Sequence, residues 1–249
     1  MRVKTLQAMR KNVKSSIHSA EGNSGRTLKE ASYVLLRADI ISQKLRPGQA
    51  IREDELSKKI GLSRTPVREM LRRLEQEDLV RVVPHRGVFV SNLTPEDIAE
   101  VLDIRIALET AAARAAALKM TEEHMTELHH ITKQLDSAVK DRDSIASFEA
   151  DSRLHNLILV TAGNHRVHRI IANLMGQILR IRFISGHKPG RINTTASEQR
   201  SIVRALERRD AEGAGDAMMV HLTNTKHMLL PISDMDEKFE ELVRKSFAQ

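Results

Sequence analysis

The stretch from Gly61 to Val80 constrains the fold more than any other part of the chain. It reads GLSRTPVREMLRRLEQEDLV, and its apolar residues recur at the three- and four-residue spacing of one helix face. Gly61 provides a turn, Ser63 a helix cap, and Pro66 is tolerated because first-turn amides have no partner within the helix. The face predicted to be buried consists of Val67, Met70, Leu71 and Leu74.

The flanking residues complete a small domain. One helix is predicted to begin with a capping box at Thr27 and to end at Pro47-Gly48, and a second covers residues 52–60. After the third helix, LVRVVPHRGVFVSN predicts two short strands around a Pro-His-Arg-Gly turn. Three helices followed by a hairpin are typical of a winged helix-turn-helix, which inserts its third helix into the major groove of DNA.

Charge is distributed unevenly along the chain. Residues 1–90 contain 19 Lys and Arg against 10 Asp and Glu, a net charge of +9, whereas the remainder contains 21 against 23, a net charge of −2. The basic first part indicates a polyanionic partner. Aromatic residues make up only 2% of the chain, which argues against a sheet-rich fold and against single-strand binding by base stacking.

Three segments are predicted: a basic flexible tail at 1–25, the winged-helix domain at 26–93, and a helical domain at 94–249. Thr94, Pro95 and Asp97 form the start signal of the first helix of the last domain. Further helices are expected at about 121–140, 143–162, 164–186, 195–210, 212–230 and 234–246. Their short connections and apolar stripes indicate an antiparallel bundle, so the fold class is mainly α.

The chain contains 0 Cys, which excludes disulfides, cysteine-based zinc sites and cysteine nucleophiles. No apolar run approaches the ~18 residues needed to span a bilayer, and the basic N-terminus lacks the apolar centre of a secretory signal. We therefore expect a soluble, cytoplasmic protein with no membrane partner.

Arg64, Arg68 and Arg72 follow one another at four-residue intervals along the third predicted helix. Such a row is in general a solvated face. Here the cap at Ser63 places Arg64 and Thr65 in the first turn, the part of a recognition helix that reaches base edges. The planar guanidinium also matches guanine O6 and N7, so we predict that the row contacts DNA.

The sequence IGLSRTPVRE, continued by PHRGVFV, resembles the winged-helix domain of the GntR family of bacterial transcription regulators over about residues 28–92. By this resemblance Ser63, Arg64 and Arg68 contact operator bases or adjacent phosphates, and Arg72 faces phosphate or solvent. The wing tip, which borders or enters the minor groove, consists of His85, Arg86 and Gly87.

Asp151 and His155 lie four residues apart, on one face of a predicted helix. A lone pair of this kind is usually a surface hydrogen bond. His221, on another predicted helix, offers a third ligand. Three such groups facing the interior of a bundle would suit a divalent ion such as Zn, Ni or Mn, with open positions for water or a ligand.

The second half resembles the FCD-type effector domain of the FadR subgroup over about residues 95–230, through LDIRIALETAAARAAA, ADSRLH, AGN and SEQRSIVRALERRDAEGAGDAMMVHL. Metal-binding members use an Asp, the His four later and two further His separated by 22 residues, and counting 22 back from His221 leads to Gln199. Three outcomes stay open: a weaker three-ligand site with water, a site that includes the Gln199 oxygen, or no metal and direct effector binding. His187, in a loop, is expected to be an exposed histidine rather than a substitute ligand.

Arg105 lies inside the apolar first helix of the second domain. Its spacing alone allows it to lie at the edge of the apolar stripe with its head group in solvent. The resemblance implies instead that it reaches the effector cavity and binds a carboxylate, for which the planar guanidinium is suited. Further candidates for effector binding are Asn164, Arg180, Arg182 and Gln199.

Together these features predict a homodimeric, sequence-specific DNA-binding regulator. We expect a repressor that binds a palindromic operator and is modulated by a small carboxylate metabolite. Two alternatives stay open. One is a metal-dependent enzyme, against which no general base or nucleophile is positioned beside Asp151 and His155. The other is an architectural DNA binder without sensing, which would leave the large helical domain unexplained.

Overall fold

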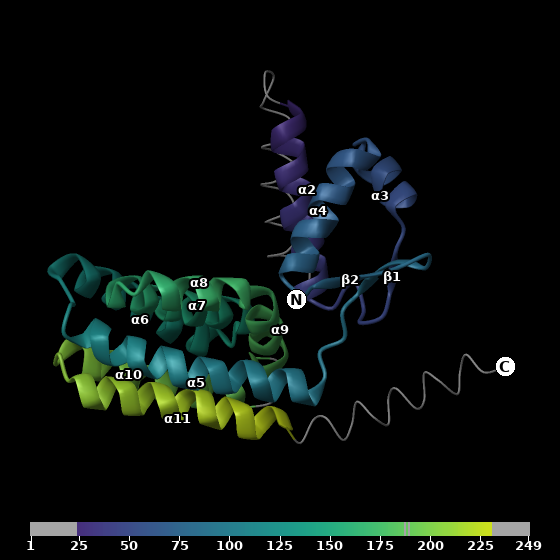
Figure 1. Ribbon diagram of the computed structural model, residues 1–249. Coiled ribbons are helices and arrows are strands. Elements are labelled where there is room, and N and C mark those ends of the chain that lie inside the picture. The colour runs from purple at the N-terminus through teal and green to yellow at the C-terminus, as the bar shows by residue number, and fades with distance from the viewer. Residues whose placement is uncertain (1–23, 187, 189, 231–249) are drawn as a thin grey trace. The chain divides into compact units, whose positions relative to one another are not determined.

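The computed structural model describes residues 24–186, 188 and 190–230. Its contacts divide the chain into two compact units. The N-terminal unit ends at Asn92 and also includes residues 175–180. The C-terminal unit contains the rest of the chain. Figure 1 shows the helices and strands of both units, which are described separately below.

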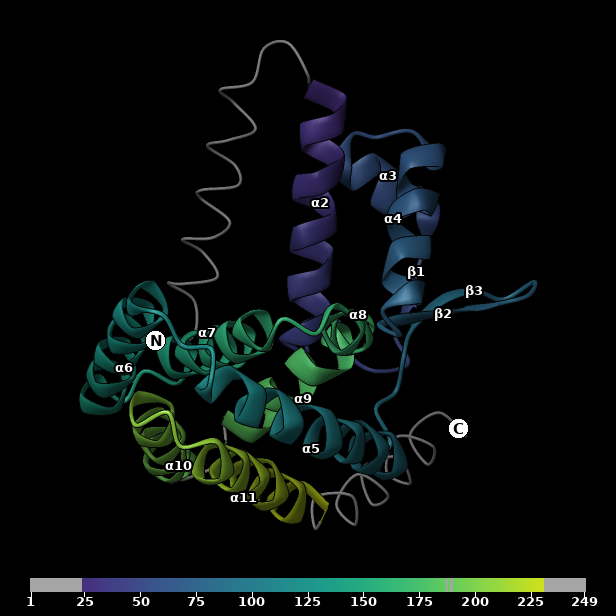
Figure 2. The same cartoon turned by 60° about the vertical axis from the view of Figure 1, so that its left-hand side comes forward.

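The N-terminal unit combines helices with a small antiparallel sheet. Its elements are α2 (Ser24–Ile41), β1 (Ala50–Ile51), α3 (Glu53–Ile60), α4 (Arg64–Gln76), β2 (Val80–Val83) and β3 (Gly87–Val90). The strand order is β1-β3-β2, with Val82 opposite Val88 and Ala50 opposite Phe89. Figure 2 shows β2 and β3 as a hairpin that extends from the helices of this unit. This is a winged helix-turn-helix, as the sequence predicts.

The predicted apolar face of α4 forms the centre of this unit. All four of its residues are buried: Val67, Met70, Leu71 and Leu74. Gly61 ends α3 with φ +79°, a left-handed conformation that glycine adopts without steric cost, and so allows the tight turn into α4. The turn leaves the opposite face of α4, with its arginines, exposed.

The first helix differs from its predicted bounds. It begins at Ser24, three residues before the expected cap at Thr27, and ends at Ile41 rather than at Pro47-Gly48. Residues 42–48 form turns instead, and Gln43 has φ +55°. A capping motif that lies inside a longer helix produces this error, because the motif is local and does not forbid earlier helical residues. The predicted flexible tail lies mostly outside the described residues.

The C-terminal unit is a helical bundle, which confirms the predicted fold class. Its helices are α5 (Pro95–Ala117), α6 (Glu122–Asp141), α7 (Ser144–Ala162), α8 (His165–Asn173), α9 (Met175–Gly186), α10 (Arg191–Glu207) and α11 (Ala211–Leu229). Residues 175–180, the first half of α9, are assigned to the N-terminal unit. The capping box at the start of α5 forms as predicted: Thr94 accepts from the Asp97 amide, and Asp97 accepts from the Thr94 amide.

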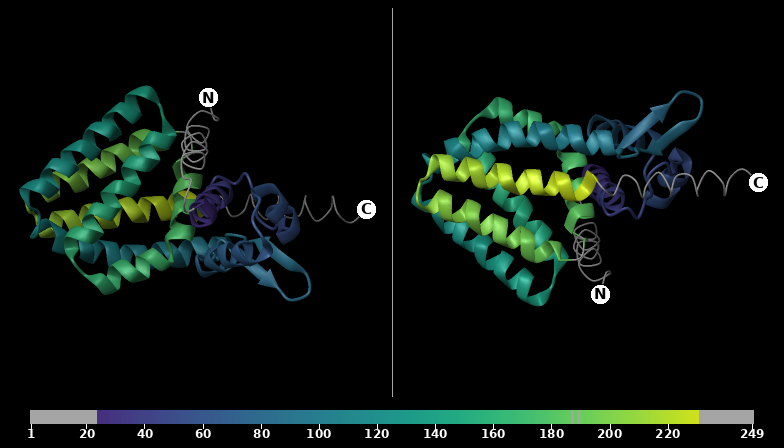
Figure 3. Two further views of the ribbon diagram at one scale, coloured as in Figure 1. Left: turned by 90° about the horizontal axis from the view of Figure 1, so that it is seen from above. Right: turned by 90° about the horizontal axis from the view of Figure 1, so that it is seen from below.

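Helices α5 and α11 run antiparallel and side by side along the bundle (Figure 3). Arg114, near the end of α5, pairs with Glu212 at the start of α11, and Asp103 pairs with Lys226 near its end. The approach is close, because a Cβ built on Gly215 would lie 2.7 Å from the Arg114 side chain. These ion pairs at the surface fix the register between the two helices.

Two predicted helix bounds need correction. The helix expected over 164–186 is two helices, α8 and α9, separated at Leu174. Asn173 and Gly176 flank the break, and both have low helix propensity. Helix α10 begins at Arg191, directly after Gly190 with φ +75°, rather than at residue 195. The helix expected at 234–246 lies outside the described residues.

Candidate functional site

The exposed face of α4 holds the arginines predicted to contact DNA. The side chains of Arg64 and Arg68 are 65% and 61% exposed. Each forms an ion pair with an acid of α3: Arg64 Nε lies 2.9 Å from Asp54 Oδ1, and Arg68 Nε lies 2.8 Å from Glu53 Oε2. Exposed ion pairs of this kind are weak, so phosphate or base edges can replace the carboxylates at little cost.

The remaining predicted contact residues surround this face or form the turn of the hairpin. Ser63 occupies the N-cap position of α4, but its side chain makes no capping hydrogen bond, so the hydroxyl is free to bind another acceptor. Thr65 and Arg72 are exposed on the same helix. Exposed residues also make up the turn and the start of β3: His85 with φ +60°, Arg86, and Gly87 with φ +107°.

A second cluster lies buried in the helical bundle. Helix α7 contributes Asp151 and His155, and α11 contributes His221. Asp151 Oδ1 lies 3.6 Å from His155 Nε2 and 3.7 Å from His221 Nε2, and the two Nε2 atoms are 3.4 Å apart. The structure thus brings together the three side chains that were predicted as metal ligands.

Each of the two histidines has its other ring nitrogen against a carboxylate. His155 Nδ1 bonds Glu109 of α5, and His221 Nδ1 lies 2.8 Å from Glu198 Oε2 of α10. A carboxylate accepts a hydrogen from Nδ1 and so leaves the Nε2 lone pair free. Both lone pairs are therefore directed toward the space beside Asp151, in the arrangement that supports metal-ligating histidines.

The dimensions of the cluster fit a divalent cation. Nitrogen and oxygen ligands at about 2.1 Å from a tetrahedral ion lie about 3.4 Å from one another. The three donor-to-donor distances, 3.4, 3.6 and 3.7 Å, are close to this value. One carboxylate and two neutral imidazoles can hold Zn, Ni or Mn.

Gln199 of α10 adjoins this cluster. The residue is 1% exposed, and its Nε2 donates a hydrogen bond of 2.5 Å to Asp151 Oδ1. Its Oε1 is buried and has no hydrogen-bond partner within the described part of the chain. Gln199 therefore contacts the candidate metal ligands and does not line the neighbouring pocket.

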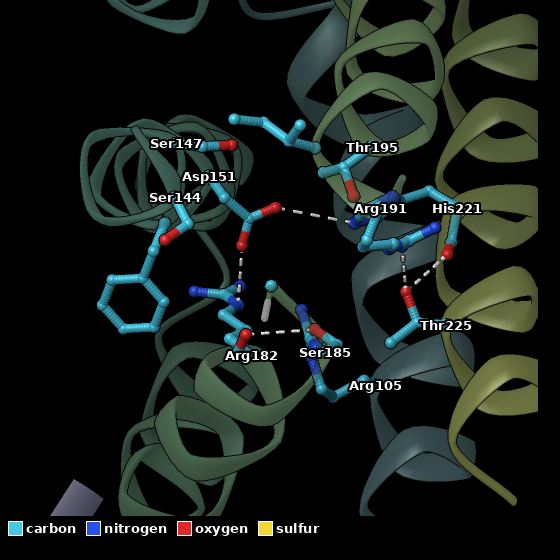
Figure 4. Close-up of a pocket in the computed structure, with 13 residues that line it drawn as sticks. Arg105, Ser144, Ser147, Asp151, Arg182, Ser185, Arg191, Thr195, His221 and Thr225 are labelled. Carbon is cyan, nitrogen blue, oxygen red and sulfur yellow. Dashed lines mark hydrogen bonds and ion pairs between the residues drawn. The ribbon is translucent and has the colours of Figure 1, made fainter. Parts of the chain in front are cut away.

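A polar pocket opens beside the cluster, with an empty volume of about 450 Å³ that includes its mouth. Asp151 of α7 and His221 of α11 belong both to this lining and to the cluster, and Figure 4 shows them on facing helices. Three arginines from different helices line the pocket: Arg105, Arg182 and Arg191. The lining also contains five hydroxyl side chains: Ser144, Ser147, Ser185, Thr195 and Thr225. These groups can bind an anion and hydrogen-bond its substituents.

Every arginine of the pocket has an acidic partner. Arg105 Nε lies 2.6 Å from Glu109 Oε1, Arg182 Nε lies 3.0 Å from Asp151 Oδ2, and Arg191 lies 3.2 Å from Glu198 Oε2. With neutral histidines, three guanidinium groups and three carboxylates give these six side chains a net charge of zero. A bound divalent cation would raise that charge to +2, which favours an anionic ligand.

These contacts shift the pKa values of several groups. Burial raises the pKa of Asp151, but the positive charges of Arg182 and the nearby histidines lower it more, so that it lies well below its usual value. The pKa of Glu109 is lowered in the same way by Arg105 and His155. Burial lowers the pKa of His221 below 6.5, because a charged imidazole is costly away from water. The shifts of Asp151 and His221 thus favour the ionised carboxylate and the neutral imidazole that a metal requires.

Of the other residues predicted to bind the effector, Arg105 and Arg182 line the pocket, whereas Asn164 and Arg180 lie elsewhere. Arg105 is 1% exposed, so it does not extend into solvent from the edge of the apolar stripe. Asn164 is exposed and caps α8, where its side chain accepts from the amides of Arg166 and Val167. Arg180 is buried outside the pocket lining. His187 lies outside the described residues.

Sequence reasoning missed three residues: Glu109, Glu198 and Arg191. Glu109 follows Arg105 by four residues in an apolar helix, which is a usable sign of a buried ion pair. Glu198 and Arg191 have no comparable local pattern, because their partners His221 and Thr225 lie on α11.

None of the helices in the described ranges is long and apolar enough to cross a membrane.

A winged helix-turn-helix and a helical bundle with a polar internal pocket define a class of protein: DNA-binding transcription regulators with a sensor domain. Two family patterns match the chain, "Bacterial regulatory proteins, gntR family" over residues 14–90 and "FCD domain" over residues 100–224. The chain belongs to the GntR family of bacterial regulatory proteins and carries an FCD domain.

Relatives and solved structures agree with this assignment. The HTH-type transcriptional repressor RspR of Escherichia coli K12 is 30% identical over 190 residues, which is 76% of this chain and 83% of the relative. An HTH-type regulator of Streptomyces ambofaciens is 32% identical over 199 residues, or 80% and 83% of the two chains. A solved GntR regulator from Rhodococcus has the same fold, with a TM-score of 0.69 at 22% identity, covering 82% and 97% of the two chains. The protein is therefore a transcription regulator and not an enzyme.

Proposed function

We propose that this regulator is a cytoplasmic repressor whose binding to operator DNA is lowered by a small carboxylate metabolite in the FCD domain. A divalent metal held by Asp151, His155 and His221 assists that binding. The observation that carries the proposal is the pocket lined by three arginines, which shares Asp151 and His221 with the candidate metal cluster.

The DNA-binding part of the proposal depends on α4 and the hairpin. Arg64 and Thr65 lie in the first turn of α4, exposed and beside the unbonded hydroxyl of Ser63. Arg68 is one turn further along, and Arg72 would face phosphate or solvent. In a homodimer, two such helices separated by about 34–36 Å would match a palindromic site. The wing residues His85, Arg86 and Gly87 would contact the neighbouring minor groove.

The effector-binding part depends on guanidinium N–H groups that have no acceptor. Arg191 Nε is buried without a hydrogen-bond partner in the described part of the chain, although other atoms of Arg191 bind Thr225 and Glu198. Arg182 Nε is at ion-pair distance from Asp151, but the angle is not that of a hydrogen bond. A bound carboxylate would accept from these groups and satisfy them.

The hydroxyl groups of the pocket narrow the class of carboxylate. Ser144, Ser147, Ser185, Thr195 and Thr225 line it, whereas its large apolar side chains are Phe148 and Ile192. A long acyl chain would leave these hydroxyls without partners, which is costly for buried polar groups. The pocket therefore favours a short acid that carries hydroxyl or further polar substituents.

The candidate metal site adjoins the effector pocket and would support acid binding. When bound, a divalent cation supplies positive charge, and an open coordination position can accept a ligand oxygen. Asp151, His155 and His221 would hold it, and Glu109 and Glu198 fix the orientation of the two imidazoles. Effector binding can release DNA only if it favours an arrangement of the protein that fits the operator less well.

The proposal is tested with operator fragments recovered from genomic DNA by binding to the purified protein. A shared palindrome among them supports a sequence-specific repressor, whereas fragments without a motif support the architectural alternative. Short hydroxy acids are then added to the complex, and each is compared with its primary amide, which has the same shape without the charge. We expect release by an acid and not by its amide. Equal release by both, or by neither across the series, would contradict a carboxylate effector.

A further inference from the structure

Gln199 donates a hydrogen bond to Asp151, one of the three candidate metal ligands. Gln199 Nε2 lies 2.5 Å from Asp151 Oδ1, the same oxygen that lies 3.6 and 3.7 Å from the Nε2 atoms of His155 and His221. The amide head group is therefore within reach of the space on which the three donors converge. In the structure, its N–H satisfies the carboxylate in place of a cation.

The other end of the amide has no partner. Gln199 is 1% exposed, and its Oε1 makes no hydrogen bond with residues 24–186, 188 or 190–230. Leaving a buried carbonyl oxygen unpaired is unfavourable, and this oxygen belongs to a side chain already in contact with a candidate metal ligand. A half-turn of the terminal amide would exchange the positions of Nε2 and Oε1. It would place an oxygen beside Asp151 Oδ1, a contact between two acceptors that is favourable only with a cation between them.

We propose that Gln199 is a fourth metal ligand, whose amide turns to present Oε1 when a divalent cation enters the site. The resulting set has two imidazole nitrogens and two oxygens, one of them neutral. The inference depends on the metal part of the proposed function. It adds a fourth ligand to the candidate site and predicts how strongly the site prefers Zn to Mn.

The donor types determine the selectivity. Imidazole suits Zn and Ni, whereas carboxylate and amide oxygens suit Mn and Mg better. A site with two oxygens from Asp151 and Gln199 therefore prefers Zn to Mn by a smaller factor than a site with three imidazoles. The Gln199 amide also competes with the cation, since it must break its bond to Asp151 before the oxygen can coordinate.

The test measures Zn and Mn affinities of the full-length, chelator-stripped protein by competition with a chromophoric chelator. In Gln199→His an imidazole replaces the amide oxygen, and we expect the ratio of Zn to Mn affinity to rise about tenfold. Gln199→Leu keeps the approximate volume without a donor and should weaken Mn binding more than Zn binding. Gln76→His, on the exposed end of α4, makes the same chemical change elsewhere and should leave the ratio unchanged.

A second readout reports the amide itself. The side-chain amide resonance of Gln199, identified as the signal missing from Gln199→Leu, should shift when diamagnetic Zn is added, because its N–H groups lose Asp151 as an acceptor. Circular dichroism establishes that each variant folds. An unchanged Zn-to-Mn ratio in folded Gln199→His, an unmoved resonance, or no metal binding by the natural protein would each overturn the proposal. Release of operator DNA by a carboxylate is measured separately, so it can fail or hold independently of this result.

Discussion

His155 Nε2 and His221 Nε2 lie 3.4 Å apart, although the two residues are 66 positions apart in the sequence. Each ring is oriented by a carboxylate on its far side, Glu109 for His155 and Glu198 for His221. Two imidazole lone pairs that face each other beside an aspartate are unfavourable until a positive charge lies between them. The convergence of these three donors, with a carboxylate behind each ring, supports the proposed cation site.

Glu198→Gln should weaken metal binding, which is measured on variant protein shown to be folded by circular dichroism. The substitution removes the carboxylate that accepts from His221 Nδ1, and loss of such a supporting partner lowers metal affinity by about 10- to 100-fold. Isothermal titration with Zn measures the effect. Glu212→Gln, which changes an exposed acid at the start of α11, serves as the control. Equal affinities for both variants would show that Glu198 does not support the site.

Glu109→Gln should strongly destabilise the C-terminal domain. Glu109 and Arg105 are both 1% exposed, and removing one partner of a buried pair leaves the other charge uncompensated, at a cost of about 3–5 kcal/mol. Urea unfolding measures the change. The matched substitution Asp136→Asn breaks an exposed pair with Arg200 and should cost at most about 1 kcal/mol. Similar costs for the two variants would mean that the Glu109 charge is solvated.

The metal-free protein should lose stability in two steps as the pH falls. The pKa values of His221, Glu109 and Asp151 are all lowered in the folded state, so protons bind preferentially to the unfolded chain. Their contributions are present above the unfolded pKa values, about 6.5 for His and about 4 for the carboxyls, and decrease as the pH falls toward the folded values. Urea unfolding in the presence of chelator, at a series of pH values, measures both steps.

His221→Gln identifies the source of the first step. The variant has no imidazole to protonate at this position, so its stability should change less between pH 7 and pH 5.5 than that of the natural protein. His227→Gln removes an exposed histidine of the same helix and should retain the step. A step of the same size in the His221 variant would assign it to another group.

Arg64→Ala should weaken binding to operator DNA by about 1–3 kcal/mol and reduce base preference at one position. The expected cause is the loss of a base contact from the first turn of α4. Binding to random DNA should change less. Fluorescence anisotropy with both kinds of DNA measures the difference, and Arg72→Ala, assigned to phosphate, should weaken both equally. A uniform loss for Arg64→Ala would make it a phosphate contact.

Features that depend on neighbouring residues in the sequence could be predicted, whereas contacts between distant helices could not. The buried face of α4 and the capping box at Thr94 follow from spacing alone. The placement of Asp151 and His155 on one helix face follows in the same way. Their meeting with His221 could not be derived from any local pattern, because it depends on how α7 approaches α11 in the folded bundle.

The acidic partners show the same limit. Glu198 contacts His221 across two helices, and Arg191 lies at the start of a helix whose first turn was not predicted. Asn164 shows the opposite case, because asparagine before a helix is a common cap and its role in capping α8 was readable from the sequence. Asn164 is also a secondary candidate for effector binding from the sequence, but it does not line the pocket.

Helix α5 has a mechanical consequence for signalling. It runs from Pro95 to Ala117 with no proline or glycine after its first residue, so no kink is built into it. Arg105 lines the pocket, and Glu109 bonds Arg105 and His155. Both residues lie on the unkinked helix that Thr94 caps, and Thr94 follows the last strand of the wing by four residues. A twist of this helix at Arg105 would reach its N-terminus, about 15 Å away, with little loss of angle. If the proposed effector displaces Arg105 or Glu109, it would move this helix directly, without a relay of rearranged side chains.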